Sequence, residues 1–183
     1  MSANPGAGVQ KIGKYDLLQK LGDGATSAVY LGHDSFANRD VAIKLVTQSA
    51  LKDAASAKVT HHLFLTEASL AGKLIHPHIV EIYDAAADDE HAYIVMEYVD
   101  GGTLQRFTRA DNLLGLGDVI EIVYKCTRAL DFASQLGVIH RDIKPANILI
   151  KGETDIKISD FGAAAMLTTT RTMVDGIGTP AYM

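Results

Sequence analysis

The pattern of residues 15–46 constrains the fold most strongly, because short apolar runs alternate there with very short connections. The sequence predicts three strands at residues 15–21, 28–33 and 40–46, and the last is enriched in β-branched residues. Connections of this length join neighbouring strands that run in opposite directions. An antiparallel meander is therefore expected near the start of the chain.

A helix and two further strands are expected after the meander. Leucines recur at near-helical spacing within residues 54–75, and the His76-Pro77 step ends that pattern. The apolar runs at residues 79–84 and 93–99 predict strands separated by an acidic turn. Together with the meander, these elements form a first lobe of five strands and one helix.

After Gly101 and Gly102 the pattern becomes helical. Asp118 is expected to be the N-cap of a helix that Gly137 stops. Cys126 is interpreted as an ordinary member of the apolar face of this helix. That predicted face consists of Val119, Ile122, Val123, Cys126, Leu130, Ala133 and Leu136. Two short strand-like pieces, NILI and IKIS, come next, and the remaining Thr- and Ala-rich residues have the composition of a loop.

Composition and charge exclude several classes of protein. The chain has 183 residues, a formal net charge of −5 and one cysteine. A nucleic-acid-binding surface needs a basic stripe or a strongly positive total, so nucleic acid is not expected as a partner. A single cysteine forms no internal disulfide, and no segment reaches the roughly 18 apolar residues that span a bilayer. We therefore expect a cytoplasmic protein with no membrane segment in this chain.

The turn between the first two predicted strands carries a glycine-rich sequence, LGDGATSAV. Gly22 and Gly24 would let backbone N–H groups approach phosphate oxygens, although an ordinary hairpin also uses glycine in its turn. The run VAIK places the ammonium of Lys44 on a following strand. An ion pair with Glu67, on the predicted helix, would direct that ammonium towards two phosphates.

The strongest motifs are HRDIKPANILI at residues 140–150 and ISDFGA at residues 158–163. With the glycine-rich turn and VAIK, they occur in the order typical of the protein-kinase family, which the chain resembles over nearly its whole length. The lysine at position 144, two residues after Asp142, makes this motif similar to that of the serine/threonine branch of the family.

The resemblance implies an α+β, bilobal fold. Its N-lobe would be a five-stranded antiparallel sheet plus one helix, and its C-lobe would be incomplete and mainly helical. The expected organisation is a flexible tail (residues 1–10), an N-lobe with hinge (11–99) and a partial C-lobe with catalytic loop and activation segment (100–183).

The same resemblance implies roles for the motif residues. Asp142 would orient the substrate hydroxyl and accept its proton, while Lys144 would neutralise charge on the transferred phosphoryl group. Asn147 and Asp160 offer the hard oxygen ligands that Mg²⁺ (or Mn²⁺) accepts. Thr179 is expected to hydrogen-bond Asp142 and Lys144. The expected catalytic set is Asp142, Lys144, Lys44, Glu67 and Thr179.

Residues 96–104 are similar to the hinge of the family, and Met96 would be its gatekeeper residue. The backbones of Glu97 and Val99 would hold the adenine. The residues expected to contact ATP are Leu21, Gly22, Asp23, Gly24, Ala25, Thr26, Ser27, Val29, Ala42, Lys44, Met96, Glu97, Val99, Thr103 and Leu149. The residues expected to form an apolar stack linking the first helix to the metal loop are Ala71, Ile82, His140 and Phe161.

Residues 160–179 resemble an activation segment. Arg141 precedes Asp142, as in kinases whose loop is ordered when a phosphothreonine pairs with that arginine. Autophosphorylation at Thr170 and Thr172 is the hypothesis, and a plain solvated loop is the alternative. Ser27 replaces the third glycine of the phosphate loop, and we interpret this as tolerated.

The expected function is ATP-dependent transfer of the γ-phosphoryl group to Ser or Thr of protein substrates. The sequence stops before the later helices of the family's domain, so the helix at residues 118–136 is expected to expose apolar surface and favour self-association. The alternative is a nucleotide-binding module without turnover. A small-molecule kinase is disfavoured by the GTPAYM segment, and a Walker-type ATPase by the lack of its motif.

Overall fold

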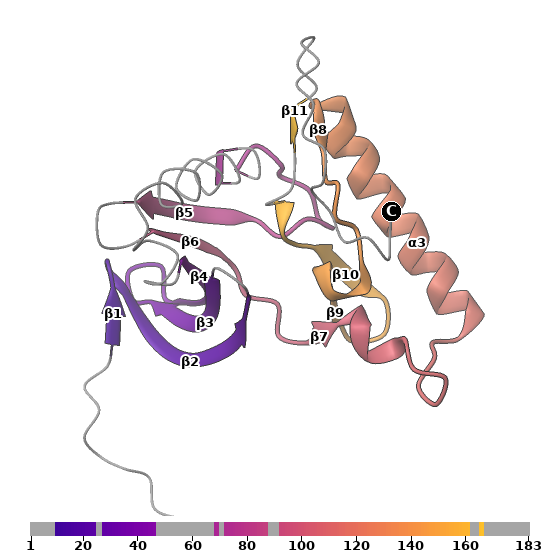
Figure 1. Cartoon of the computed structure of the whole chain (residues 1–183), viewed down its shortest axis with the longest axis horizontal. Coiled ribbons are helices and arrows are strands. Elements are labelled where there is room, and N and C mark those ends of the chain that lie inside the picture. The colour runs from indigo at the N-terminus through magenta and orange to yellow at the C-terminus, as the bar shows by residue number, and fades with distance from the viewer. Residues whose placement is uncertain are drawn as a thin grey trace, which may run out of the picture. The chain divides into compact units, whose positions relative to one another are not determined.

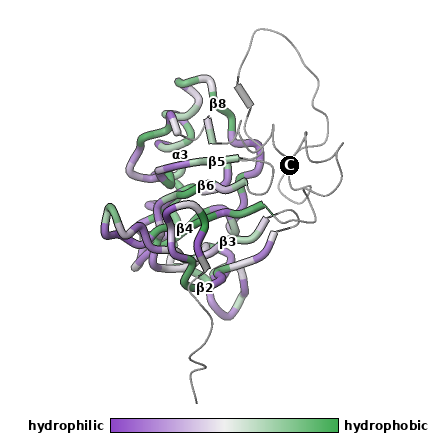
Figure 2. Tube along the Cα trace, turned by 90° about the vertical axis from the view of Figure 1, so that its left-hand side faces the viewer, coloured by the Kyte–Doolittle hydropathy of each residue, from purple (hydrophilic) through white to green (hydrophobic). Residues whose placement is uncertain are grey.

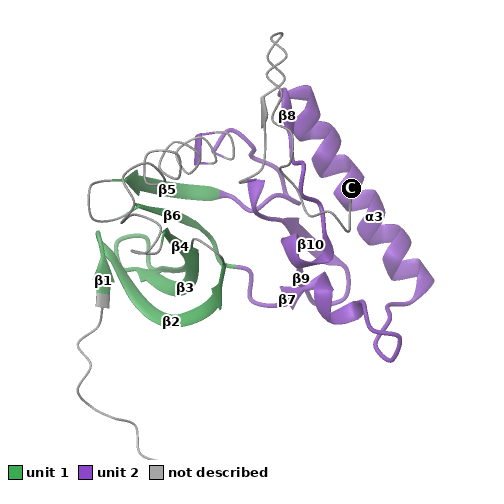
Figure 3. Ribbon diagram, in the orientation of Figure 1, with its two compact units in different colours: residues 1–62, 82–98 green, residues 63–81, 99–183 purple. Residues whose placement is uncertain are grey.

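The computed structural model describes residues 10–24, 27–46, 68–69, 72–87, 92–161 and 165–166. The chain forms two compact units (Figure 3): residues 1–62 with 82–98, and residues 63–81 with 99–183. The predicted division into a tail and two lobes stays a prediction. Among the described residues, no helix has the length and apolar character needed to span a bilayer.

The first unit contains a six-stranded antiparallel sheet in the order β1-β2-β3-β4-β6-β5, which curls strongly in Figure 1. The three strands of the predicted meander are confirmed. The strands are β1 (Gln10–Ile12), β2 (Tyr15–Asp23), β3 (Ser27–Asp34), β4 (Arg39–Val46), β5 (Ile82–Ala87) and β6 (Ala92–Glu97).

The sheet differs from the predicted one at two places. The short strand β1 was not expected; it pairs with β2 because Ile12 is buried beside Tyr15. The strand predicted to start at Ile79 starts at Ile82 instead. Ile79 forms an isolated parallel bridge with Ile158 in the second unit.

The core of the first unit lies on one face of β4. Val41 and Ile43 are completely buried with Val95 of β6, while Ile12 and Tyr15 close the cluster from β1 and β2. The hydrophobic stretches of β4 and β6 are drawn in green in Figure 2. Burial of several large aliphatic side chains together is the main stabilising contribution to such a unit.

Two small sheets and one long helix form the described part of the second unit. The sheets have the orders β10-β9-β7 and β11-β8, and Ile148, Ile150 and Ile156 pack with Ile122 of α3. The predicted NILI and IKIS strands are confirmed to within a residue. The elements are β7 (Gly102–Thr103), η1 (Leu104–Phe107), α3 (Leu116–Gln135), β8 (Val138–Ile139), η2 (Pro145–Asn147), β9 (Ile148–Lys151), β10 (Asp155–Ile158) and β11 (Ala165–Met166).

The ends of α3 agree only in part with the prediction. The N-cap is Gly115 rather than Asp118, because the helix starts at Leu116 and so places Asp118 inside the first turn. A carboxylate there still interacts favourably with the helix dipole. The predicted stop is confirmed: Gly137 has φ +77°, and its N–H donates to the Ser134 carbonyl at 2.9 Å.

The predicted apolar face of α3 is wrong in part. Ile122, Ala129 and Ala133 are buried, and Val119 and Val123 are exposed. Apolar residues lie on more than one side of this helix, so their spacing alone did not identify the buried side. The exposed large apolar side chains of α3 are Leu116, Val119, Ile120, Val123 and Tyr124.

A histidine pair precedes β5 and contacts α3. The ring of His76 lies 5.2 Å from that of Phe132, and the His78 N–H donates to His76 Nδ1 at 3.1 Å. His78 Nδ1 lies 3.2 Å from the Ile156 carbonyl, to which it donates. The predicted helix before this loop lies mostly outside the described residues. These contacts attach the loop to both α3 and β10.

Acidification should destabilise the chain through His76. Burial, followed by the charges of His78, Arg128 and Lys157, lowers the pKa of His76. The unfolded chain therefore binds a proton more readily, and stability falls as the pH drops through about 6.5, the ordinary histidine value. Between about pH 7.5 and about pH 5.5 the melting temperature should fall less in His76→Phe than in the unaltered chain. The substitution keeps an aromatic ring against Phe132. Equal losses in both proteins would contradict the prediction.

Candidate functional site

One face of the first sheet carries four of the residues expected to contact ATP. Val29 of β3 pairs with Lys44 of β4, and Ala42 of β4 pairs with Met96 of β6. Directly paired residues share a face, as do residues two apart along a strand. Val29, Ala42, Lys44 and Met96 therefore lie together, on the face opposite the Ile43 side of β4.

The glycine-rich turn begins at the end of β2. Gly22 lies opposite Val29 in the register, and the Gly24 N–H donates to the Ser27 carbonyl at 2.7 Å. Residues 21–24 are all exposed, including the predicted contacts Leu21 and Asp23. Ala25 and Thr26 lie outside the described residues. The described part of the turn thus presents accessible backbone beside the face that carries Lys44.

The second unit carries another group of predicted ATP contacts. Thr103 of β7 pairs with Leu149 of β9, so these two side chains share a face. Glu97 is the last residue of β6, in the first unit, and Val99 follows in the second. The structure therefore divides the predicted ATP contacts between the two units.

Gly101 has a packing role that the sequence analysis missed. A Cβ atom at this position would collide with the carbonyl of Ile150. Only glycine permits such a close backbone approach. This approach sets β7 against β9 and so fixes the pairing of Thr103 with Leu149.

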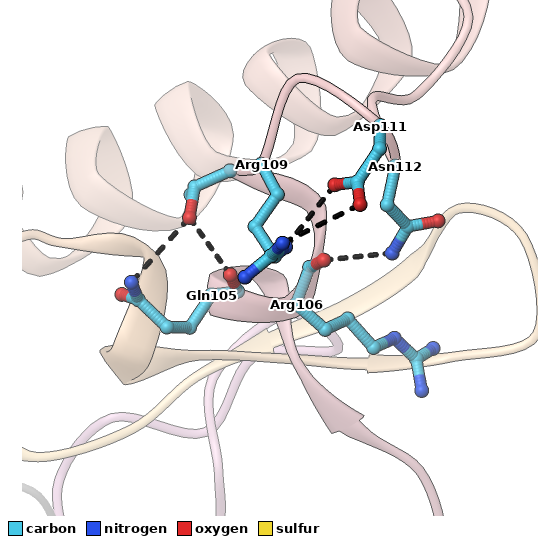
Figure 4. Close-up of polar contacts among 6 residues, drawn as sticks. Gln105, Arg106, Arg109, Asp111 and Asn112 are labelled. Carbon is cyan, nitrogen blue, oxygen red and sulfur yellow. Dashed lines mark hydrogen bonds and ion pairs between the residues drawn. The ribbon is translucent and has the colours of Figure 1, made fainter.

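A polar loop follows Thr103 and leads to α3 (Figure 4). Asn112 Nδ2 donates to the Arg106 carbonyl at 2.7 Å, and Arg109 Nε lies 3.1 Å from an oxygen of Asp111. Thr108 Oγ1 donates to the Gln105 carbonyl at 2.8 Å. These local contacts order the connection between η1 and α3.

Asp142 lies at the centre of the catalytic-loop motif. Its Oδ2 lies 2.8 Å from Lys144 Nζ and accepts a hydrogen bond from Asn147 Nδ2 at 3.1 Å. Asn147 Nδ2 also donates to the Asp142 carbonyl at 2.9 Å. The structure thus brings together three residues that the motif predicted to act together. The bonds made by Nδ2 identify Oδ1 as the atom through which Asn147 would accept a cation.

Two motif residues other than glycine have left-handed backbones: Arg141 (φ +67°) and Asp160 (φ +60°). Such conformations cost about 1–3 kcal/mol each and persist where surrounding contacts enforce them. His140 supplies two such contacts. Its Nδ1 accepts from the Asp142 N–H at 3.2 Å, and its Nε2 donates to the Ser159 carbonyl at 2.9 Å. This pattern requires a neutral imidazole with its proton on Nε2, and burial lowers the pKa of His140.

The predicted apolar stack is described in part. The rings of His140 and Phe161 lie 4.5 Å apart, and both residues are buried. Ile82 belongs to the first unit, and Ala71 lies outside the described residues. The other predicted residues outside the described part of the chain are Glu67, Thr170, Thr172 and Thr179.

The chemistry of Asn147 and Asp160 fits a magnesium ion. The Ser159 N–H donates to the Asn147 carbonyl at 2.9 Å, so the residue before Asp160 is hydrogen-bonded to Asn147. An amide oxygen and a carboxylate are hard ligands, and Mg²⁺ takes few of them because it keeps waters and nucleotide oxygens. No group of three or more His, Cys, Asp or Glu side chains suited to a metal occurs among the described residues.

Comparison with known proteins agrees with these motifs. The protein kinase domain model matches residues 15–183. The chain is 40% identical over 158 residues to the serine/threonine-protein kinase PrkC of Bacillus subtilis, covering 86% of this chain and 24% of the relative. It is 38% identical over 177 residues to the serine/threonine-protein kinase PknB of Mycobacterium leprae, covering 93% of this chain and 28% of the relative.

A probable serine/threonine-protein kinase of Clostridium acetobutylicum is 36% identical over 166 residues, covering 88% of this chain and 25% of the relative. The chain thus spans about a quarter of the length of these curated relatives. The predicted kinase-like α+β fold class is confirmed. The family match extends over the glycine-rich turn, VAIK, the catalytic loop and the DFG motif. The chain therefore belongs to the protein kinase family, and it is of the serine/threonine, Hanks type.

Proposed function

We propose that this chain binds ATP with Mg²⁺ (or Mn²⁺) and transfers the γ-phosphoryl group to serine or threonine hydroxyls of protein substrates. Protein kinases in general use ATP and a divalent metal and act on proteins. The observation that carries the proposal is the contact of Asp142 with both Lys144 and Asn147. It supports the assignment of Asp142 as a general base next to an ammonium that neutralises phosphate charge and an amide that binds the metal.

Asp142 orients the attacking hydroxyl and accepts its proton. The ammonium of Lys144, at 2.8 Å from Asp142 Oδ2, keeps the carboxylate in place and would neutralise charge on the transferred group. Thr179 is assigned a supporting hydrogen bond to both residues. The side chains of Asp142 and Lys144 are only partly exposed, which strengthens their electrostatic interactions.

Asn147 and Asp160 are proposed as the metal ligands. Asn147 would use its Oδ1, because Nδ2 donates to Asp142. The bound metal neutralises charge on the phosphate oxygens. Asp160 would contribute a carboxylate from a left-handed backbone position.

The first unit is proposed to bind the phosphates and the adenine. Lys44, directed by Glu67, neutralises phosphate charge, and the glycine-rich turn offers backbone N–H groups. Val29 and Ala42, which share a face with Lys44, contact the adenine ring. The backbones of Glu97 and Val99 hydrogen-bond the adenine edge.

Regulation is proposed to act through the segment at residues 160–179. Phosphate on Thr170 or Thr172 would pair with the guanidinium of Arg141 and order that segment. Arg141 is exposed and precedes Asp142 directly, so such a pair would act next to the catalytic base.

Incubation with Mg-ATP and a serine- and threonine-containing protein should give transferred phosphate. Asp142→Asn should lower the rate by about 100-fold or more, because general-base catalysis contributes that much. Mass spectrometry locates the phosphate on the substrate and on Thr170 and Thr172, and thermal shift with Mg-ATP reports binding separately. Stabilisation without transfer in the unaltered chain would favour the nucleotide-binding module, and the lack of both would contradict the proposal.

A further inference from the structure

Ser159 is buried directly before Asp160, and three of its polar groups are hydrogen-bonded. Its N–H and its hydroxyl both donate to the Asn147 carbonyl, at 2.9 Å and 3.2 Å. Its own carbonyl accepts from His140 Nε2 at 2.9 Å. One carbonyl oxygen has two lone pairs, so Asn147 can accept both bonds from Ser159. This residue therefore contacts the catalytic loop on two sides.

These bonds are part of a closed ring of four residues. The Asp142 N–H donates to His140, His140 donates to Ser159, Ser159 donates to Asn147, and Asn147 Nδ2 donates to Asp142. His140, Ser159 and Asn147 are each more than nine-tenths buried. Hydrogen bonds in such surroundings are stronger than in water, and a broken member leaves a buried group unpaired.

The ring lies next to two residues with strained backbones. Asp160 follows Ser159 with φ +60°, and Arg141 lies between His140 and Asp142 with φ +67°. Ring residues lie on both sides of Arg141 and directly before Asp160, so their hydrogen bonds are suited to hold both positions. Ser159 is the one ring member with no assigned role in phosphoryl transfer or in the apolar stack.

We propose that Ser159 is a positioning residue whose hydroxyl, through the Asn147 carbonyl, fixes the two metal ligands Asn147 and Asp160 in productive register. The inference rests on the proposed function of those two ligands. The Ser159 N–H is present whatever the side chain, so loss of the hydroxyl removes one of two bonds to that carbonyl. The expected effect is therefore a graded loss of metal-dependent nucleotide affinity rather than unfolding.

Calorimetric titration of the chain with ADP, in Mg²⁺ and in EDTA, tests the role of the hydroxyl. Ser159→Ala should weaken binding about 3- to 10-fold in Mg²⁺, the range of one net hydrogen bond, and leave binding in EDTA within about twofold. Ser159→Thr, which keeps a hydroxyl, should match the unaltered chain. Should Ser159→Ala not fold, Ser159→Cys replaces it, because a thiol is only a weak donor.

Equal weakening in Mg²⁺ and in EDTA would assign Ser159 a merely structural role and overturn the inference. Unchanged affinity in Mg²⁺ would overturn it as well. Asp160→Asn distinguishes this failure from failure of the proposed function. If Asp160→Asn loses the gain in ADP affinity that Mg²⁺ gives over EDTA, and Ser159→Ala keeps this gain, only the Ser159 inference fails. If the unaltered chain shows no Mg²⁺ effect, both fail.

Discussion

Asp160→Asn should remove most of the Mg²⁺-dependent gain in nucleotide affinity. The substitution replaces a charged oxygen ligand by a neutral amide. Mutation of a residue that only hydrogen-bonds to a metal ligand lowers metal affinity about 10- to 100-fold, and loss of the ligand itself should cost at least as much. Asparagine tolerates a left-handed backbone as well as aspartate does, so the φ of +60° at this position is kept. Calorimetry with ADP in Mg²⁺ and in EDTA measures the effect.

Asp155→Asn is a matched control for that experiment. Asp155 begins β10 with an exposed carboxylate, five residues before Asp160. Its substitution makes the same change in net charge in the same unit, and it should leave nucleotide affinity in Mg²⁺ unchanged. An equal loss in both variants would show that bulk charge, rather than ligation by Asp160, governs the affinity.

The strands were predictable because their patterns are local. The run from Val41 to Val46 is apolar except at Lys44 and is rich in β-branched residues, and this local composition needs no partner strand to be recognised. Strand β1 is only three residues long, and its strand character depends on pairing with β2. A segment of that length carries too little periodicity to predict.

The buried side of α3 could not be predicted from the helix alone. Val119 and Val123 are as apolar as Ile122, yet only Ile122 is buried, because it packs against Ile148, Ile150 and Ile156. Which side of a helix is buried depends on the strands that it meets. Those strands, β9 and β10, come later in the sequence.

The candidate site was predictable as a set of residues but not as a set of hydrogen bonds. The motifs identified Asp142, Asn147 and Asp160, because their residue types suit base and metal-ligand chemistry. The hydrogen bonds of Ser159 join residues far apart in the sequence, such as His140 and Ser159, and they lie beside the left-handed residues Arg141 and Asp160. Neither left-handed residue is a glycine, and aspartate only tolerates this conformation, so the sequence does not predict these turns.

Ile43→Ala should destabilise the first unit by about 2–5 kcal/mol, the range for removing a large buried aliphatic side chain. Ile43 is completely buried between Val41 and Val95. Its neighbour Lys44 lies on the opposite face of β4, which is proposed to bind the nucleotide. Lys44→Met keeps an apolar stem of similar length, so it should cost less than about 1 kcal/mol of stability while weakening ATP binding.

Urea unfolding and ATP titration on both variants separate the two faces of β4. Ile43→Ala should lose stability and, while folded, keep its affinity for ATP, since its side chain does not face the nucleotide. Lys44→Met should show the reverse. If Lys44→Met lowered stability as much as Ile43→Ala without changing ATP affinity, Lys44 would be a structural residue, and the proposed nucleotide face of the first sheet would be wrong.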